Sequence, residues 1–175
     1  FAKSLIETAL IDLASKQREI PAYELFGGKI HDSLPLAWTL ASGDTNRDIE
    51  EAKEMLHQRR HNIFKLKIGS GDADANVKHV GEIIKAVGNE SRITVDINQG
   101  WDEYTALKQI KALEEMGVSM IEQPLPTWNY KGMRRLTERF DVSILADESA
   151  TSLHDTYRII KERAGDAIAL KPAKH

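Results

Sequence analysis

The order in which short apolar runs and longer helical stretches follow one another is the feature that most restricts how this chain can fold. Runs rich in Val, Ile and Leu alternate with stretches of helical periodicity, and a sixth run stands near the end. The expected strands are 34–41, 63–69, 92–98, 119–124, 142–148 and 167–172, and the expected helices are 46–60, 73–87, 103–116, 130–139 and 153–163. Strands that alternate with single helices form parallel sheets built of βαβ units.

Two α/β architectures fit this alternation, a doubly wound open sheet and a (β/α)8 barrel. A dinucleotide-binding open sheet carries G-x-G-x-x-G after an early strand, and the Gly-Ser-Gly at 69–71 does not extend into that pattern. Ionisable residues stand at the C-terminal ends of successive strands, where barrel enzymes build their active sites. We therefore predict a (β/α)8-type TIM barrel, of which this chain holds about six βα units.

The first 33 residues form a separate region in this prediction. An Ala- and Leu-rich helix is followed by a break at Pro21 and a short turn that ends at Gly27 and Gly28. We expect residues 1–33 to be a linker helix region and residues 34–175 to be the partial barrel.

The polar residues of the strands fall in one register. Lys65 and Lys67 share a parity on the second strand, and Asp96, Glu122 and Asp147 stand near the ends of the next three strands; Lys171 ends the sixth. Residues of one parity face the inside of a barrel. We therefore expect these six side chains to point inward at one end of the barrel.

Three inward carboxylates predict a divalent cation, because buried ionised carboxylates that lack compensation would rather take up protons. Oxygen ligands suit Mg²⁺ or Mn²⁺. The chain has no cysteine, and no histidine stands in register, so a zinc site is disfavoured. A single Asp or Glu after a strand is more often a helix N-cap, and Asp72 and Asp102 have only that interpretation.

The lysines then fit an acid/base role. Lys67 and Lys171 would approach a metal-bound substrate from opposite sides. A nearby dication and a second ammonium would lower their pKa values toward neutrality and make a neutral amine available as a base.

Charge and hydropathy restrict the partners. The net charge is −3 with both signs interspersed, which argues against a nucleic-acid surface. The apolar runs are far shorter than the roughly 18 residues of a membrane helix, so we expect no membrane partner and a soluble cytoplasmic protein. The chain opens on Phe1 rather than Met, and we expect its natural N-terminus to lie further upstream.

Five short motifs together resemble the enolase superfamily, in particular its muconate-lactonising subgroup. They are K-x-K at 65–67, VDIN at 95–98, IEQP at 121–124, ADES at 146–149 and LK at 170–171. The stretches 24–35, 38–45 and 59–69 are most similar to bacterial muconate cycloisomerases. The resemblance implies Mn²⁺- or Mg²⁺-assisted lactonisation of a small dicarboxylate, cis,cis-muconate, in catechol breakdown.

The resemblance also assigns roles. Asp96, Glu122 and Asp147 would hold the metal, Lys67 would be the principal acid/base, and Lys65 would contact the substrate carboxylate. Lys171 would act electrostatically from across the ligands, and Asn98 and Glu148 would support the ligands.

Alternatives stay open at this point. A dipeptide epimerase or an o-succinylbenzoate synthase would share these lysines and ligands, and a non-catalytic fragment would merely retain them. Strands seven and eight and the N-terminal capping domain of the superfamily are missing. We therefore expect an internal fragment of a protein about twice as long, inactive alone, whose parent forms a homo-oligomer.

Overall fold

The computed structural model describes residues 2–171, and these divide into two compact units. One unit comprises 36–169, and the other comprises the described residues 2–35 together with Leu170 and Lys171. The smaller unit holds helix α1 (Ala2–Gln17) and the 3-10 helix η1 (Ala22–Phe26), separated near Pro21 as the sequence predicts.

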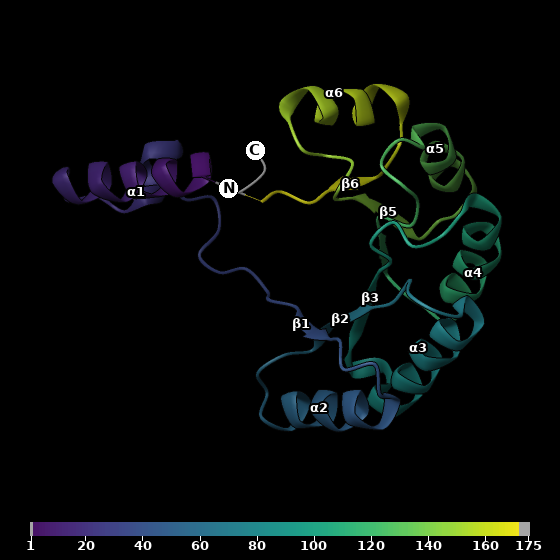
Figure 1. Ribbon diagram of the computed structural model, residues 1–175. Coiled ribbons are helices and arrows are strands. Elements are labelled where there is room, and N and C mark those ends of the chain that lie inside the picture. The colour runs from purple at the N-terminus through teal and green to yellow at the C-terminus, as the bar shows by residue number, and fades with distance from the viewer. Residues whose placement is uncertain (1, 172–175) are drawn as a thin grey trace. The chain divides into compact units, whose positions relative to one another are not determined.

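The larger unit is built on a six-stranded sheet in which every neighbouring pair is parallel and strand order follows chain order. A doubly wound sheet would reverse its strand order at a switch point, whereas this sheet continues in one direction as a barrel does. The predicted partial TIM barrel is thereby confirmed (Figure 1). The strands are β1 (Trp38–Leu40), β2 (Ile63–Lys67), β3 (Arg92–Asp96), β4 (Met120–Glu122), β5 (Ser143–Ala146) and β6 (Ala167–Ile168).

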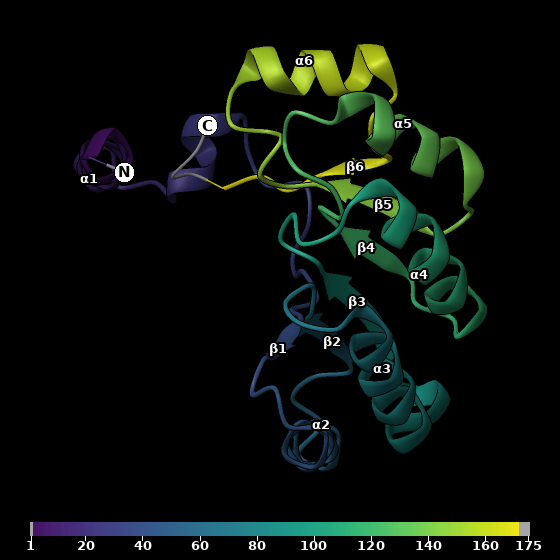
Figure 2. The same cartoon turned by 45° about the vertical axis from the view of Figure 1, so that its right-hand side comes forward.

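One helix follows each of the first five strands, and Figure 2 shows these helices along one side of the sheet. Each begins at a residue whose side chain accepts a hydrogen bond from a backbone N–H three residues on, the N-cap geometry that satisfies a free donor. Asp72 and Asp102 are two of these caps, as predicted. The helices are α2 (Thr45–His57), α3 (Ala73–Val87), α4 (Glu103–Glu115), α5 (Tyr130–Arg139) and α6 (Leu153–Glu162), and a 3-10 turn η2 (Gly88–Glu90) follows α3.

The hydrophobic core lies between the sheet and these helices. Alternate strand residues such as Phe64, Leu66 and Val95 are fully buried and pack with helix residues such as Val80 and Ile110. Side chains alternate between the two faces of a strand, so the residues between these apolar positions face the other side of the sheet. No helix within residues 2–171 is long and apolar enough to cross a membrane.

The sixth strand differs from the prediction. The expected strand 167–172 is formed only at Ala167 and Ile168, which pair with Leu145 and Ala146. Lys171 lies beyond the strand and is exposed, and Pro172 lies outside the described residues. The Ala169 N–H donates to the Ala146 carbonyl (2.9 Å). Lys171 lies two residues beyond this bond and outside the strand, so parity along a strand does not fix where its side chain points.

Candidate active site

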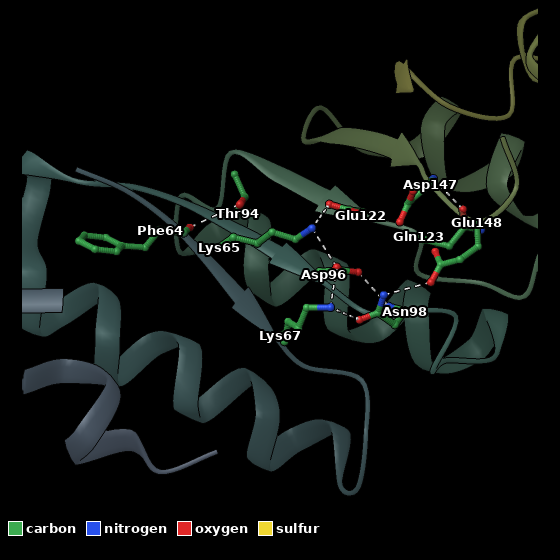
Figure 3. Close-up of polar contacts among 10 residues, drawn as sticks. All are labelled: Phe64, Lys65, Lys67, Thr94, Asp96, Asn98, Glu122, Gln123, Asp147 and Glu148. Carbon is green, nitrogen blue, oxygen red and sulfur yellow. Dashed lines mark hydrogen bonds and ion pairs between the residues drawn. The ribbon is translucent and has the colours of Figure 1, made fainter. Parts of the chain in front are cut away.

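The two lysines of β2 lie on the face of the sheet opposite the core. Phe64 and Leu66 are fully buried against the helices, while the side chains of Lys65 and Lys67 keep 24% and 48% of their surface exposed. The predicted alternation along β2 is thereby confirmed. Both ammonium groups extend toward the carboxylates that end the neighbouring strands (Figure 3).

Lys65 joins two of these carboxylates. Its Nζ atom lies 2.9 Å from Asp96 Oδ2 and 2.6 Å from Glu122 Oε2. Lys65 pairs with Thr94 across β2 and β3, and Thr94 lies two residues before Asp96. The long side chain of Lys65 therefore runs along the sheet to reach both acids. Asp96 and Glu122 are themselves direct neighbours across β3 and β4. The ammonium therefore compensates two buried negative charges at once.

The charges in this cluster shift two pKa values. Burial by itself lowers the pKa of Lys65, but hydrogen bonds to Glu122 and Asp96 and their negative charges outweigh burial and raise it above its ordinary value. Burial raises the pKa of Glu122; the bond from Lys65 lowers it, the charge of Asp96 raises it, and the net direction is upward. The carboxylates that surround the Lys65 ammonium explain this direction, and the acid/base role expected for Lys67 and Lys171 stays a prediction.

A series of polar contacts runs from Lys67 to Glu148, which follows β5. Its Nζ donates to Asn98 Oδ1 (3.2 Å) and lies 3.6 Å from Asp96 Oδ2. Asn98 in turn donates from Nδ2 to Glu148 Oε1 (3.0 Å), and its backbone N–H donates to Asp96 Oδ1 (3.1 Å). The structure thus brings Lys67, Asp96, Asn98 and Glu148 together. Lys67 is the more exposed of the two lysines and so is more open to a bound molecule.

Asp147 and Lys171 belong to different compact units. Asp147 follows β5 in the larger unit, is 2% exposed, and donates its backbone N–H to Gln123 Oε1 (2.9 Å). Lys171 is exposed and belongs to the unit that contains α1. Its expected position opposite the carboxylates stays a prediction.

The three acidic residues fit a divalent cation in their chemistry. Asp96, Glu122 and Asp147 are 1%, 8% and 2% exposed. Asp96 and Glu122 end β3 and β4, and Asp147 directly follows β5, the next parallel strand. Such hard oxygen donors suit Mg²⁺ or Mn²⁺, and burial of Glu122 outweighs the bond from Lys65 in raising the pKa of this carboxyl. Within residues 2–171, no three acidic, His or Cys side chains are drawn together closely enough to hold a metal ion. Their role as ligands is therefore taken up below as a proposal.

Sequence reasoning missed one residue at this site and one cluster beside it. Gln123 is fully buried and hydrogen-bonds to the backbone around Asp147; its position directly after Glu122 was the only available signal. Beside β1, the buried Asp48 accepts from the Ser42 hydroxyl (2.6 Å) and lies 3.4 Å from His79 Nε2. No histidine was assigned a role, because a histidine on a helix carries no signal of its partner.

Comparison with known proteins identifies this arrangement. Residues 47–175 match the family model described as "Enolase C-terminal domain-like". The chain belongs to the enolase C-terminal domain-like family. The predicted resemblance to the enolase superfamily is thereby confirmed, and the βα units described above belong to an enolase C-terminal-like domain.

Several curated relatives of this chain are named as cycloisomerases. The chain is 48% identical over 170 residues to a chloromuconate cycloisomerase of Cupriavidus necator, covering 97% of this chain and 46% of that protein. It is 48% identical over 171 residues to muconate cycloisomerase 1 of Acinetobacter baylyi, covering 98% of this chain and 46% of that protein. The chain thus spans about half the length of the curated relatives it matches.

Solved structures agree with this comparison. Muconate cycloisomerase from Pseudomonas fluorescens superposes with a TM-score of 0.94 at 47% identity, over 97% of this chain and 47% of that one. The muconate lactonizing enzyme of the same species, complexed with muconolactone, gives a TM-score of 0.95 at 47% identity over 97% and 46% of the two chains.

Proposed function

We propose that the complete protein containing residues 1–175 is a muconate cycloisomerase, which interconverts cis,cis-muconate and muconolactone. The observation that carries the proposal is the placement of Lys65 and Lys67 beside the buried carboxylates at the ends of β3 and β4. The cycloisomerase names of relatives 48% identical over nearly the whole chain support it.

Asp96, Glu122 and Asp147 would hold Mn²⁺ or Mg²⁺ in this proposal. Such an ion, when bound, supplies positive charge that stabilises the negative charge developing on a substrate carboxylate. Asp96 and Glu122 already share the ammonium of Lys65, and Asn98 holds Asp96 through its backbone N–H. These contacts orient two of the three acids before any ligand arrives.

Lys67 would carry the proton in this reaction. One carboxylate of muconate adds to the diene and forms the C–O bond of the lactone, and the carbon next to the other carboxylate takes a proton from the Lys67 ammonium. In the reverse direction the neutral amine removes that proton and the C–O bond breaks. Lys65, held as an ammonium between two acids, would contact the substrate carboxylate, and Lys171 would act electrostatically.

The test is the loss of ultraviolet absorbance of cis,cis-muconate on addition of the complete protein and Mn²⁺. We expect rapid loss that EDTA abolishes and that returns when excess Mn²⁺ is added. An absorbance that stays constant with Mn²⁺ or Mg²⁺ present would contradict the proposed substrate.

A further inference from the structure

Both polar atoms of the Gln123 side chain are hydrogen-bonded twice, although the side chain carries no charge. It follows Glu122 directly and is fully buried. Its Oε1 atom accepts from the backbone N–H groups of Asp147 (2.9 Å) and Ser149 (3.1 Å). Its Nε2 atom donates to the Leu125 carbonyl (2.9 Å) and the Ser149 hydroxyl (2.7 Å). The side chain thus fastens the end of β4 to the turn that carries Asp147.

The backbone of Gln123 makes two more connections. Its N–H donates to the Leu145 carbonyl of β5 (2.8 Å), and its carbonyl accepts from the N–H of Gln99 (2.8 Å), which follows β3. One residue therefore links the segments after β3, β4 and β5. The first two of these segments begin within one to three residues after Asp96 and Glu122, and the third contains Asp147.

The conformation of Gln123 indicates that these bonds outweigh a local cost. Its φ is 40°, in the left-handed region that side chains other than Gly, Asn and Asp disfavour. Such a conformation persists only where the surroundings enforce it. Here the enforcing contacts are the hydrogen bonds to the segment 147–149 and to Leu125.

We infer that Gln123 is a positioning residue, which sets the spacing of the Asp147 carboxylate relative to Asp96 and Glu122 for a bound divalent cation. The inference rests on the proposed metal role of these acids. Gln123 does not touch the ion or the substrate; it acts through the backbone of residues 147–149. Hydrogen bonds to ligand-bearing groups of this kind typically change metal affinity 10- to 100-fold.

The decisive variant is Gln123→Asn in the complete protein. Asn tolerates a positive φ, so the backbone is retained, while a side chain one methylene shorter cannot span to both N–H groups of the 147–149 turn. We expect Mn²⁺ affinity, measured by the loss of the free-ion electron paramagnetic resonance signal, to fall about 10-fold or more. Gln123→Glu keeps the length and the oxygen that accepts from the 147–149 turn but loses the donor to the Leu125 carbonyl, so it should recover only part of that loss.

Gln109→Asn is the matched control, because Gln109 is also a buried glutamine and donates to Asp74 Oδ1 (2.7 Å) between α3 and α4. It should lower the melting temperature comparably while leaving Mn²⁺ affinity within about twofold of the parent. Unchanged affinity in Gln123→Asn, or an equal loss in Gln109→Asn, would overturn the positioning role alone. A parent protein that binds no Mn²⁺ would overturn the proposed metal site, and this inference with it.

Discussion

At the residue scale, the two lysines of β2 occupy different surroundings although they are two positions apart. Lys65 is bound between Asp96 and Glu122, whereas Lys67 contacts Asn98 and is half exposed. An ammonium held by two carboxylates releases its proton reluctantly, and its pKa is raised accordingly. This difference supports the proposal that Lys67 transfers the proton while Lys65 compensates the charges of Asp96 and Glu122.

Replacing Lys67 by Ala should therefore remove proton exchange and spare the metal. We expect turnover of cis,cis-muconate to fall by about 10²- to 10⁴-fold, the usual contribution of a general acid/base, with Mn²⁺ affinity nearly unchanged. Lys78→Ala, at an exposed lysine of α3, is the control and should keep parental turnover. Parental turnover in Lys67→Ala would remove Lys67 from the mechanism.

Replacing Glu122 by Gln should separate stability from metal binding. Burial and the charge of Asp96 raise the pKa of Glu122, so folding disfavours its carboxylate relative to the unfolded chain. A neutral side chain of the same shape should leave the melting temperature of the metal-free protein unchanged or higher. Mn²⁺ affinity should fall at least 10-fold in a titration calorimeter, and an unaltered affinity would exclude Glu122 from the ligands.

At the element scale, the loops after β2 and β3 approach one another too closely for side chains. Gly69 has a φ of 105°, and a Cβ atom there would lie 2.2 Å from the Ile97 carbonyl oxygen. A Cβ atom at Gly100 would lie 2.1 Å from the Gly69 carbonyl oxygen. Because these glycines have no side chain, the backbones of the loops that follow Lys67 and Asn98 in the chain can lie in direct contact.

Gly69→Ala should consequently destabilise the protein by roughly 2–4 kcal/mol, because it adds a backbone clash to an unfavourable φ. Gly71→Ala is the matched control: its φ is 73°, but nothing lies within 4 Å of the added atom. That variant should lose only about 1–2 kcal/mol. The midpoints of urea unfolding compare the two, and equal losses would show that the close approach is not costly to disturb.

The helices are joined to one another by ion pairs that predict an acid dependence. Arg135 of α5 donates from Nη2 to Glu103 Oε2 of α4 (2.6 Å), and this bond lowers the pKa of Glu103 below its ordinary value of 4.5. A lowered carboxyl pKa stabilises the fold above the unfolded-state value, and that stability is lost as pH falls through the folded-state value.

Glu103→Gln should therefore cost about 0.5 kcal/mol at pH 7 and nothing once the pH lies below the folded-state pKa. Melting temperatures from pH 7 down to pH 3 test this. Glu82→Gln, which breaks a pair inside α3 only, is the control and should change stability less at pH 7. A Glu103→Gln deficit that persisted undiminished at pH 3 would refute the assignment to this ion pair.

The helices could be predicted from the sequence because hydrophobic periodicity and N-cap residues depend only on residues close together in the chain. The expected helices at 73–87 and 130–139 coincide with α3 and α5. It failed where a contact depends on residues distant in the chain. The ion pair between Lys65 and Glu122 depends on how three strands are aligned. No local sequence pattern predicts the left-handed backbone conformation of Gln123. Strand β6 is shorter than the apolar run that predicted it.

At the scale of the whole molecule, the described sheet remains open. In the strand order, β1 and β6 each have a neighbour on one side only. Edge strands with free backbone groups invite pairing with other chains. On the sheet face opposite the core, the side chains of Lys65 and Lys67 are partly exposed.

Residues 1–175 produced alone should therefore self-associate and turn over no muconate. Sedimentation velocity should show species larger than the 19.7 kDa chain, with the proportion rising with concentration. The complete protein at equal concentration is the comparison. A stable monomer with parental turnover would show that the open edges have no such effect and that the site needs nothing further.

The connections made by Gln123 have a consequence for how such a domain can change over generations. They join the three acid-bearing segments at positions 99, 123, 147 and 149, close to the strand ends. The loop residues beyond these junctions take no part in the bonds that join positions 99, 123, 147 and 149. Insertions and substitutions there can remodel what the domain accepts while its reactive centre is inherited unaltered.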